Sequence, residues 1–228
     1  MGCVMEVFLA RVGRGSRVDQ ADQFRLAILN RSVHNHNMAR PTEFDQNKAL
    51  NKALALFWRK GYQAASLTDL LTTMDIGRSS FYAAFTDKRT LYITCMDLFA
   101  ERVMEMLERD RKEKPPIDVL QDFFAGNQVG GRHVRSDWGC MLVNSLLELA
   151  GIDEDLVARA SGHLTALQRF FETCLRDAGA LSSQARELAA MLMLFNEGIR
   201  VSNRRRLPDA QHQQTIDATF RLIRSAIA

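Results

Sequence analysis

The segment from residue 59 to residue 91 constrains the fold of this chain more than any other part of it. A short helix is expected to begin at Ser66, because Asp69 follows three residues later with the spacing of a capping box. The helix is expected to end near Asp75, since aspartate is one of the few residues that tolerate a left-handed cap. The segment therefore opens with a helix of about two turns, followed by a tight turn.

A second short helix is predicted from Arg78 to Phe85, with Gly77 as its cap. Phe81 and Phe85 are four residues apart, so they lie on one face of this helix and predict its buried side. Arg78 and Ser79 are left on other faces. Two helices that cross at a tight turn, the second with polar residues at its start, indicate a helix-turn-helix.

This segment resembles the DNA-binding domain of the TetR/AcrR family of bacterial transcription regulators, over residues 40–91. The residues that carry the resemblance are Gly61, Tyr62, Ser66, Leu67, Asp69, Leu70, Ile76, Phe81, Tyr82, Phe85 and Lys88. Asp75 stands where the family usually has glycine, and Gly77 where it often has serine. The change at Gly77 weakens the helix cap by a few tenths of a kcal/mol at most, and neither change alters the register.

The whole chain is predicted to be all-α, because we find helical periods and no strand pattern along it. A first helix over residues 44–59 should end at Gly61, and the helix that starts at Lys88 should stop before Pro115 and Pro116. The later helices are expected to begin near residue 117 and to span residues 137–150, 153–178, 183–206 and 209–228. The resemblance implies a helix-turn-helix domain at residues 38–91 and a helical ligand-binding and dimerisation domain at residues 92–228.

Composition fits a DNA-contacting domain on a larger body. Residues 38–92 carry eight Lys/Arg against five Asp/Glu, whereas residues 93–228 carry 17 against 19. The longest apolar run is far too short to cross a membrane, and no secretory signal precedes it, so we expect a cytoplasmic protein. The four cysteines have no CxxC spacing, which predicts free thiols, and we expect neither a metal nor a cofactor.

Residues 1–37 show no sustained helical period. We expect either that translation starts at Met38 or that these residues form a disordered extension. The alternative is a basic arm that reaches into the minor groove of DNA.

Seven residues are predicted to contact DNA: Thr68, Arg78, Ser79, Ser80, Tyr82, Ala83 and Lys88. By position on the second helix, Arg78, Ser79 and Ala83 can meet base edges in the major groove. Thr68, Tyr82 and Lys88 are expected at phosphates, and the resemblance implies this role most directly for Tyr82 and Lys88. The competing interpretation is that Arg78 and Lys88 are solvated charges and that Tyr82 only packs.

Large apolar side chains with a few polar ones between them predict a small-molecule pocket in the body. The expected contacts are Phe99, Phe123, Trp138, Cys140, Met141, Asn144, His163 and Phe195. Each of these residues also fits an ordinary core position. Cys140 lies at a helix start with Arg132 and Arg135 nearby in sequence, which favours a thiolate that reacts with electrophiles, although a buried inert cysteine is the commoner case.

The leading hypothesis is a repressor that dimerises through its last two helices and leaves a palindromic double-stranded DNA operator when a small molecule binds. A second hypothesis is a DNA-binding regulator or activator controlled by a protein partner. A helical enzyme is the third, and no carboxylate pair, nucleophile–base arrangement, phosphate loop or metal spacing supports it.

Overall fold

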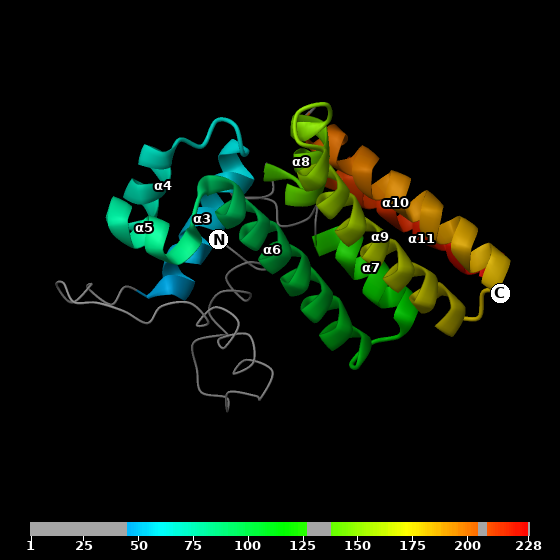
Figure 1. The fold of residues 1–228 in the computed structure, drawn as a ribbon. Coiled ribbons are helices and arrows are strands. Elements are labelled where there is room, and N and C mark those ends of the chain that lie inside the picture. Colours follow the sequence, from blue (N-terminus) through cyan, green and yellow to red (C-terminus); the bar gives the residue numbers. More distant parts are fainter. Residues whose placement is uncertain (1–44, 127–137, 205–208, 228) are drawn as a thin grey trace. The chain divides into compact units, whose positions relative to one another are not determined.

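A computed structural model describes residues 45–126, 138–204 and 209–227 (Figure 1). Every regular element in these ranges is a helix, so the all-α prediction is confirmed. None of the described helices is both long enough and apolar enough to cross a membrane. The predictions for residues 1–37, and the positions of Arg132 and Arg135, lie outside the described residues.

Helix α3, Gln46–Lys60, begins where Asp45 accepts a hydrogen bond from the backbone N–H of Lys48 at 3.0 Å. It ends at Gly61, whose φ of +84° suits glycine because a side chain would strain that backbone. The predicted stop at Gly61 is therefore confirmed. Ala53, Leu54 and Phe57 form the buried face of the helix.

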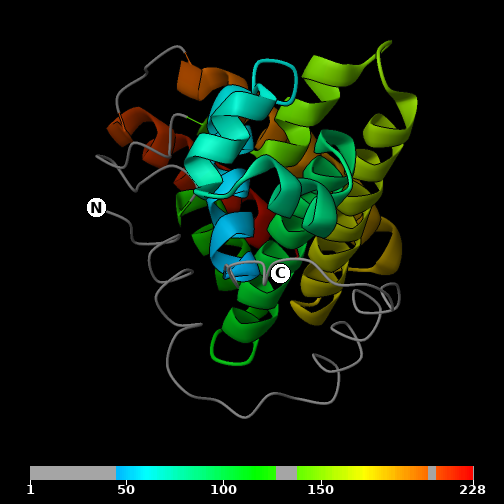
Figure 2. The same ribbon diagram turned by 60° about the vertical axis from the view of Figure 1, so that its left-hand side comes forward.

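Helices α4, Leu67–Met74, and α5, Arg78–Phe85, have the boundaries that the sequence predicts. Ser66 and Asp69 form the complete capping box at the start of α4, and Asp75 ends this helix in the left-handed region at φ 61°. Figure 2 shows α3, α4 and α5 packed beside one another. Leu70, Phe81 and Phe85 are buried between them. Tyr62, Leu67 and Ile76, which belong to the residues of the sequence resemblance, are half-buried.

A strained turn separates α5 from helix α6, Lys88–Arg111. Thr86 has φ 63° and ψ −60°, and the backbone N–H of Asp87 donates to the carbonyl of Phe85 at 2.6 Å. This is a γ-turn, which is rare for a β-branched residue because its side chain crowds the backbone. The turn fixes the direction in which α6 leaves the helix-turn-helix.

The remaining helices are α7 Pro116–Gly126, α8 Met141–Leu149, α9 Glu154–Asp177, α10 Ser182–Arg204 and α11 Asp209–Ile227. The expected start of α8 near residue 137 was wrong, because the helix begins four residues later and Cys140 is its N-cap. Phe124 lies at the centre of the aromatic core, with its ring 5.3–5.8 Å from the rings of Phe171, Phe195 and Phe220. Cys95, Cys140 and Cys174 are buried free thiols, as the cysteine spacing predicts.

Candidate nucleic-acid interface

We call residues 45–91 the head and residues 92–227 the body. One side of α5 is buried and the other is open to solvent. Phe81 is fully buried and Phe85 is 5% exposed, so these two rings anchor the helix to the head. The exposed side carries four of the predicted DNA contacts, which are Arg78, Ser79, Tyr82 and Ala83. The structure thus presents a cation, a hydroxyl, a phenol and a methyl on one face of a helix, which are the groups that meet base edges and phosphates in a major groove.

Two further predicted contacts lie beside this face. Thr68 is exposed in the first turn of α4, and Ser80 is half-buried in α5. The ring of Tyr82 lies 5.4 Å from that of Phe81 while almost half of its side chain stays exposed. Tyr82 therefore packs and is also available to a ligand, so the two interpretations of this residue are compatible.

Lys88 has a different environment from the other six residues. It is half-buried, and its Nζ lies 4.6 Å from the centre of the Tyr62 ring and 3.5 Å from the carbonyl oxygen of Gln63, to which it donates. Burial lowers the pKa of the Lys88 ammonium, although the nearby Glu148 carboxylate acts in the opposite direction. One of the three N–H donors of Lys88 thus already has an acceptor in the protein.

The start of α6 is already capped by the protein itself. The Asp87 carboxylate accepts the backbone N–H of Thr90 at 2.7 Å, and this hydrogen bond lowers the pKa of Asp87. The backbone N–H groups at the start of α6 are therefore partly occupied. Next to the cap, Arg89 forms a two-pronged ion pair with Asp153, at 2.8 and 2.9 Å, which ties the start of α6 to the start of α9.

The eight predicted ligand contacts fall into separate places. Near the start of α8, Trp138 and Phe99 both pack edge-on against Trp58, at 5.6 and 5.1 Å between ring centres. Cys140 and Met141 are buried there, and Asn144 donates to the backbone oxygen of Trp138 at 2.6 Å. These five predicted contacts share one end of α8.

The other three lie elsewhere. His163 is half-buried on α9, and its Nε2 is 2.8 Å from the Asp97 carboxylate on α6. Phe123 packs against Phe124 and Phe171 in the aromatic core. Phe195 reaches the same core from α10, with its ring 5.3 Å from that of Phe124.

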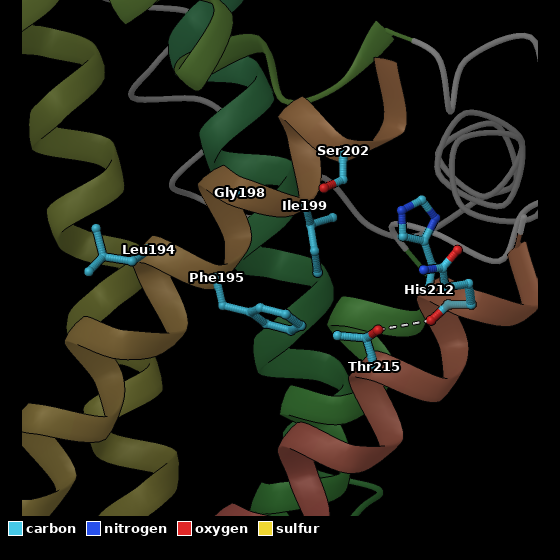
Figure 3. Close-up of a pocket in the computed structure, with 8 residues that line it drawn as sticks. Leu194, Phe195, Gly198, Ile199, Ser202, His212 and Thr215 are labelled. Carbon is cyan, nitrogen blue, oxygen red and sulfur yellow. Dashed lines mark hydrogen bonds between the residues drawn. The ribbon is translucent and has the colours of Figure 1, made fainter. Parts of the chain in front are cut away.

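A pocket of about 330 Å³ opens between α10 and α11 (Figure 3). It is lined by Leu194, Phe195, Gly198, Ile199, Ser202, Gln211, His212 and Thr215. Phe195 is the one predicted ligand contact among these lining residues. The Nε2 atom of His212 is buried and has no hydrogen-bond partner, so this pocket contains an unsatisfied polar group.

Comparison with known proteins identifies the architecture. Residues 49–95 match the family model described as bacterial regulatory proteins, tetR family. Residues 116–206 match the model of the transcriptional regulator LmrA/YxaF-like C-terminal domain. The HTH-type transcriptional repressor ComR of Escherichia coli is 30% identical over 192 residues, which cover 80% of this chain and 90% of ComR. The chain belongs to the TetR family. It is therefore a DNA-binding transcriptional regulator.

Other relatives and solved structures agree with this family. YezE of Bacillus subtilis, an uncharacterized HTH-type transcriptional regulator, is 28% identical over 167 residues, covering 70% of this chain and 84% of YezE. The TetR-family regulator CifR, solved in complex with 26-base-pair operator DNA, has the same fold with a TM-score of 0.66 and 22% identity. The likeness covers 80% of this chain and 98% of the CifR chain.

Helices α4 and α5 both lie inside residues 49–95, the range of the TetR-family match. The family and the relatives are transcriptional regulators, and these are not enzymes in general. Sequence reasoning gave no role to Arg89 or Glu148, because each acts through a partner that is more than 60 residues away in the chain.

Proposed function

We propose that this TetR-family protein is a homodimeric repressor that binds a palindromic operator and leaves it when a small molecule binds the body. The exposed face of α5 is the observation that carries the proposal. Four side chains suited to DNA contacts share this face, and the buried Phe81 and Phe85 hold the helix firmly from the opposite side. A rigid helix with such a face can enter a major groove without rearrangement.

In this proposal some side chains contact DNA bases and others contact the phosphate backbone of the DNA. Arg78 forks onto a guanine, Ser79 and Ser80 accept or donate at base edges or phosphates, and the Ala83 methyl contacts a thymine methyl. Tyr82 and Thr68 donate to phosphates from either side of this contact. Side chains that were merely solvated would need no common direction, whereas Arg78, Tyr82 and Ala83 share one exposed face with Ser79.

Dimerisation is supported by apolar side chains that α10 and α11 leave open to solvent. Met191 and Leu194 on α10 are 63% and 69% exposed, and Leu222 on α11 is 72% exposed. Gly198, one turn beyond Leu194, has open space around the position of a Cβ atom, so a second helix can approach closely there. A second copy of the chain would bury this face and close the pocket in Figure 3.

Release by a small molecule is supported by the cluster at the start of α8. Trp138, Met141 and Asn144 bring aromatic, flexible and amide groups together there, which suits a site for a small, mainly apolar effector. A regulator controlled by a protein partner is the second candidate. The dense ring packing around Phe124 favours it, because Phe123 and Phe171 fill their part of the body with protein side chains.

The test is binding to the DNA upstream of the protein's own gene, measured by fluorescence anisotropy with and without candidate inducers. We expect saturable binding by a dimer, and weaker binding when the inducer is present. Absence of any preference for this DNA over an unrelated duplex of the same length would contradict a role for α5 in operator recognition. Binding that no small molecule weakens would favour control by a protein partner.

Replacing Arg78 with alanine is expected to weaken operator binding by roughly 10- to 100-fold at each half-site, because alanine cannot form the forked hydrogen bonds to guanine. The variant should also discriminate less between base pairs at the position that Arg78 reads. Anisotropy titrations against the operator and single-base variants measure both effects. Arg176→Ala removes the same charge from the exposed last turn of α9 and should leave both unchanged. An Arg78 variant that equals this control would show that Arg78 is only a solvated charge.

Replacing Lys88 with glutamine tests whether this side chain binds a phosphate of the operator. If it does, the slope of log affinity against log salt concentration should fall by about 0.9 for each phosphate that is no longer neutralised. The slope is measured from titrations at several salt concentrations. Lys112→Gln, at the exposed end of α6, serves as the control. An unchanged slope in the Lys88 variant would mean that Lys88 neutralises no phosphate in the complex.

A further inference from the structure

A carboxylate of the body holds the connection between α3 and α4. The Oε2 atom of Glu148, on α8, accepts the backbone N–H of Tyr62 at 2.9 Å, and its Oε1 atom accepts the N–H of Gln63 at 2.7 Å. The side-chain amide of Gln63 returns a hydrogen bond to the backbone oxygen of Glu148 at 3.3 Å. Three hydrogen bonds thus join the last turn of α8 to two consecutive residues of the head.

Gly61 gives the Glu148 carboxylate the space that it occupies in this contact. A Cβ atom added to Gly61 would lie 2.7 and 2.8 Å from the two carboxylate oxygens of Glu148, which is closer than van der Waals contact allows. Gly61 therefore serves two purposes, because it adopts the positive φ that ends α3 and it admits the carboxylate. The sequence resemblance includes this glycine but gives no reason for the second purpose.

The contact also reaches Lys88, the first residue of α6. Lys88 donates to the carbonyl oxygen of Gln63, whose N–H donates to Glu148, and its ammonium lies over the ring of Tyr62, whose N–H also donates to Glu148. The Glu148 carboxylate thus holds Tyr62 and Gln63, the two residues that Lys88 contacts. A change in the position of Glu148 would alter where Lys88 rests.

The opposite end of α8 contacts the head through a separate hydrogen bond. The indole Nε1 of Trp58, on α3, donates to the backbone oxygen of Gly139 at 2.8 Å, directly before the Cys140 cap. Helix α8 is therefore joined to the head before its first turn and again at its last turn. Since α8 is only nine residues long, a displacement at one end moves the other end with it.

We propose that Glu148 is a positioning residue that transmits the position of α8 to the DNA-binding head. The proposal rests on the proposed function, because it names the path by which an effector near Met141 would change operator affinity. Charged acceptors make stronger hydrogen bonds than neutral ones, so the two N–H contacts make the connection stiff. The segment that they hold leads within three residues to the Ser66 cap of α4, and so sets where α4 and α5 begin.

The first experiment uses the full chain without DNA and measures amide hydrogen exchange at Tyr62 and Gln63. Glu148→Gln keeps the size of the side chain but replaces one acceptor oxygen with an NH₂ donor that faces a donor. We expect exchange at the two amides to accelerate at least about tenfold. Glu154→Gln is the matched control, because the Glu154 carboxylate accepts the Gly151 N–H at 2.8 Å within the body and does not touch the head.

The second experiment tests transmission with a double-mutant cycle. Met141 is 1% exposed at the first position of α8, so Met141→Ala leaves a void into which the helix start can shift. We expect this change to accelerate exchange at Tyr62 and Gln63 in the wild-type background and to have no such effect in the E148Q background. Equal acceleration in both backgrounds, or unchanged amides in E148Q itself, would overturn the proposal.

Operator binding provides the link to function. E148Q is expected to bind the DNA upstream of the protein's own gene about tenfold more weakly than the wild type, whereas E154Q binds it normally. Equal binding by E148Q and E154Q would overturn the functional part of the proposal. If the wild-type protein does not bind this DNA at all, the proposed function fails, and the exchange cycle still decides whether Glu148 transmits the position of α8.

Discussion

Replacing Leu194 with glutamate is expected to convert the dimer into monomers and to lower operator affinity by at least about 10³-fold. Leu194 is 69% exposed beside Met191, on the face of α10 that we assign to the partner. In a twofold dimer the new carboxylates of the two copies would be buried near one another, and their desolvation and repulsion both oppose association. A monomer reads a single half-site, so it retains little more than non-specific affinity.

Light scattering after size exclusion measures the mass, and anisotropy with the operator measures the affinity. Leu181→Glu is the matched control, since Leu181 is 75% exposed and precedes the first residue of α10. This variant should remain a dimer with normal affinity. If the Leu194 variant also remains a dimer and binds normally, the interface between subunits does not include this face of α10 and α11. The pocket in Figure 3 then stays open to other ligands.

The helix-turn-helix could be predicted closely because its boundaries depend on local rules. The Ser66–Asp69 capping box, the left-handed Asp75 and the Gly77 cap each involve residues that are within a few positions of one another. Such signals act before any long-range packing is known. The boundaries of α4 and α5 therefore agree with the sequence prediction at both ends.

The environment of Lys88 could not be predicted in the same way. Its position depends on Tyr62 and Gln63. These two residues depend in turn on Glu148, which lies 86 and 85 residues further along the chain, respectively. The γ-turn at Thr86 was equally hidden, since threonine gives no sequence signal for a positive φ. The start of α8 was misplaced for a related reason, because Trp138 and Gly139 fit a helical period but are used in contacts with Trp58.

Amino-acid composition does not tell which of the predicted ligand contacts lie close to one another. Aromatic and polar side chains in the body suggested one pocket, yet His163 pairs with Asp97 while Phe123 packs against Phe171. Burial acts to raise the pKa of the Asp97 carboxyl, but one hydrogen bond from His163 and two from Arg159 outweigh it, so that this pKa is lowered. Which side chains converge is decided by helix packing, and composition does not contain that information.

Replacing Phe81 with alanine is expected to destabilise the head by about 3–5 kcal/mol and thereby to weaken operator binding. The Phe81 side chain is fully buried, with its ring 5.4 Å from Tyr82 and 5.9 Å from Phe85. The loss is a large part of the stability of a small domain, so α5 would unfold locally. Urea denaturation measures the free energy of unfolding, and amide exchange shows where protection disappears.

Phe124→Ala is the matched control, because Phe124 is 1% exposed at the centre of the aromatic core of the body. It should cost a similar free energy while the amides of α5 keep their protection. Operator DNA distinguishes the two defects further. DNA binds only the folded head. Free operator at 100 times its dissociation constant therefore stabilises the folded head by about 2.7 kcal/mol, and this should restore much of the amide protection of α5 in the Phe81 variant. A loss below about 1 kcal/mol would mean that the head repacks around the missing ring, and α5 would then owe its orientation to its caps and to the Thr86 turn.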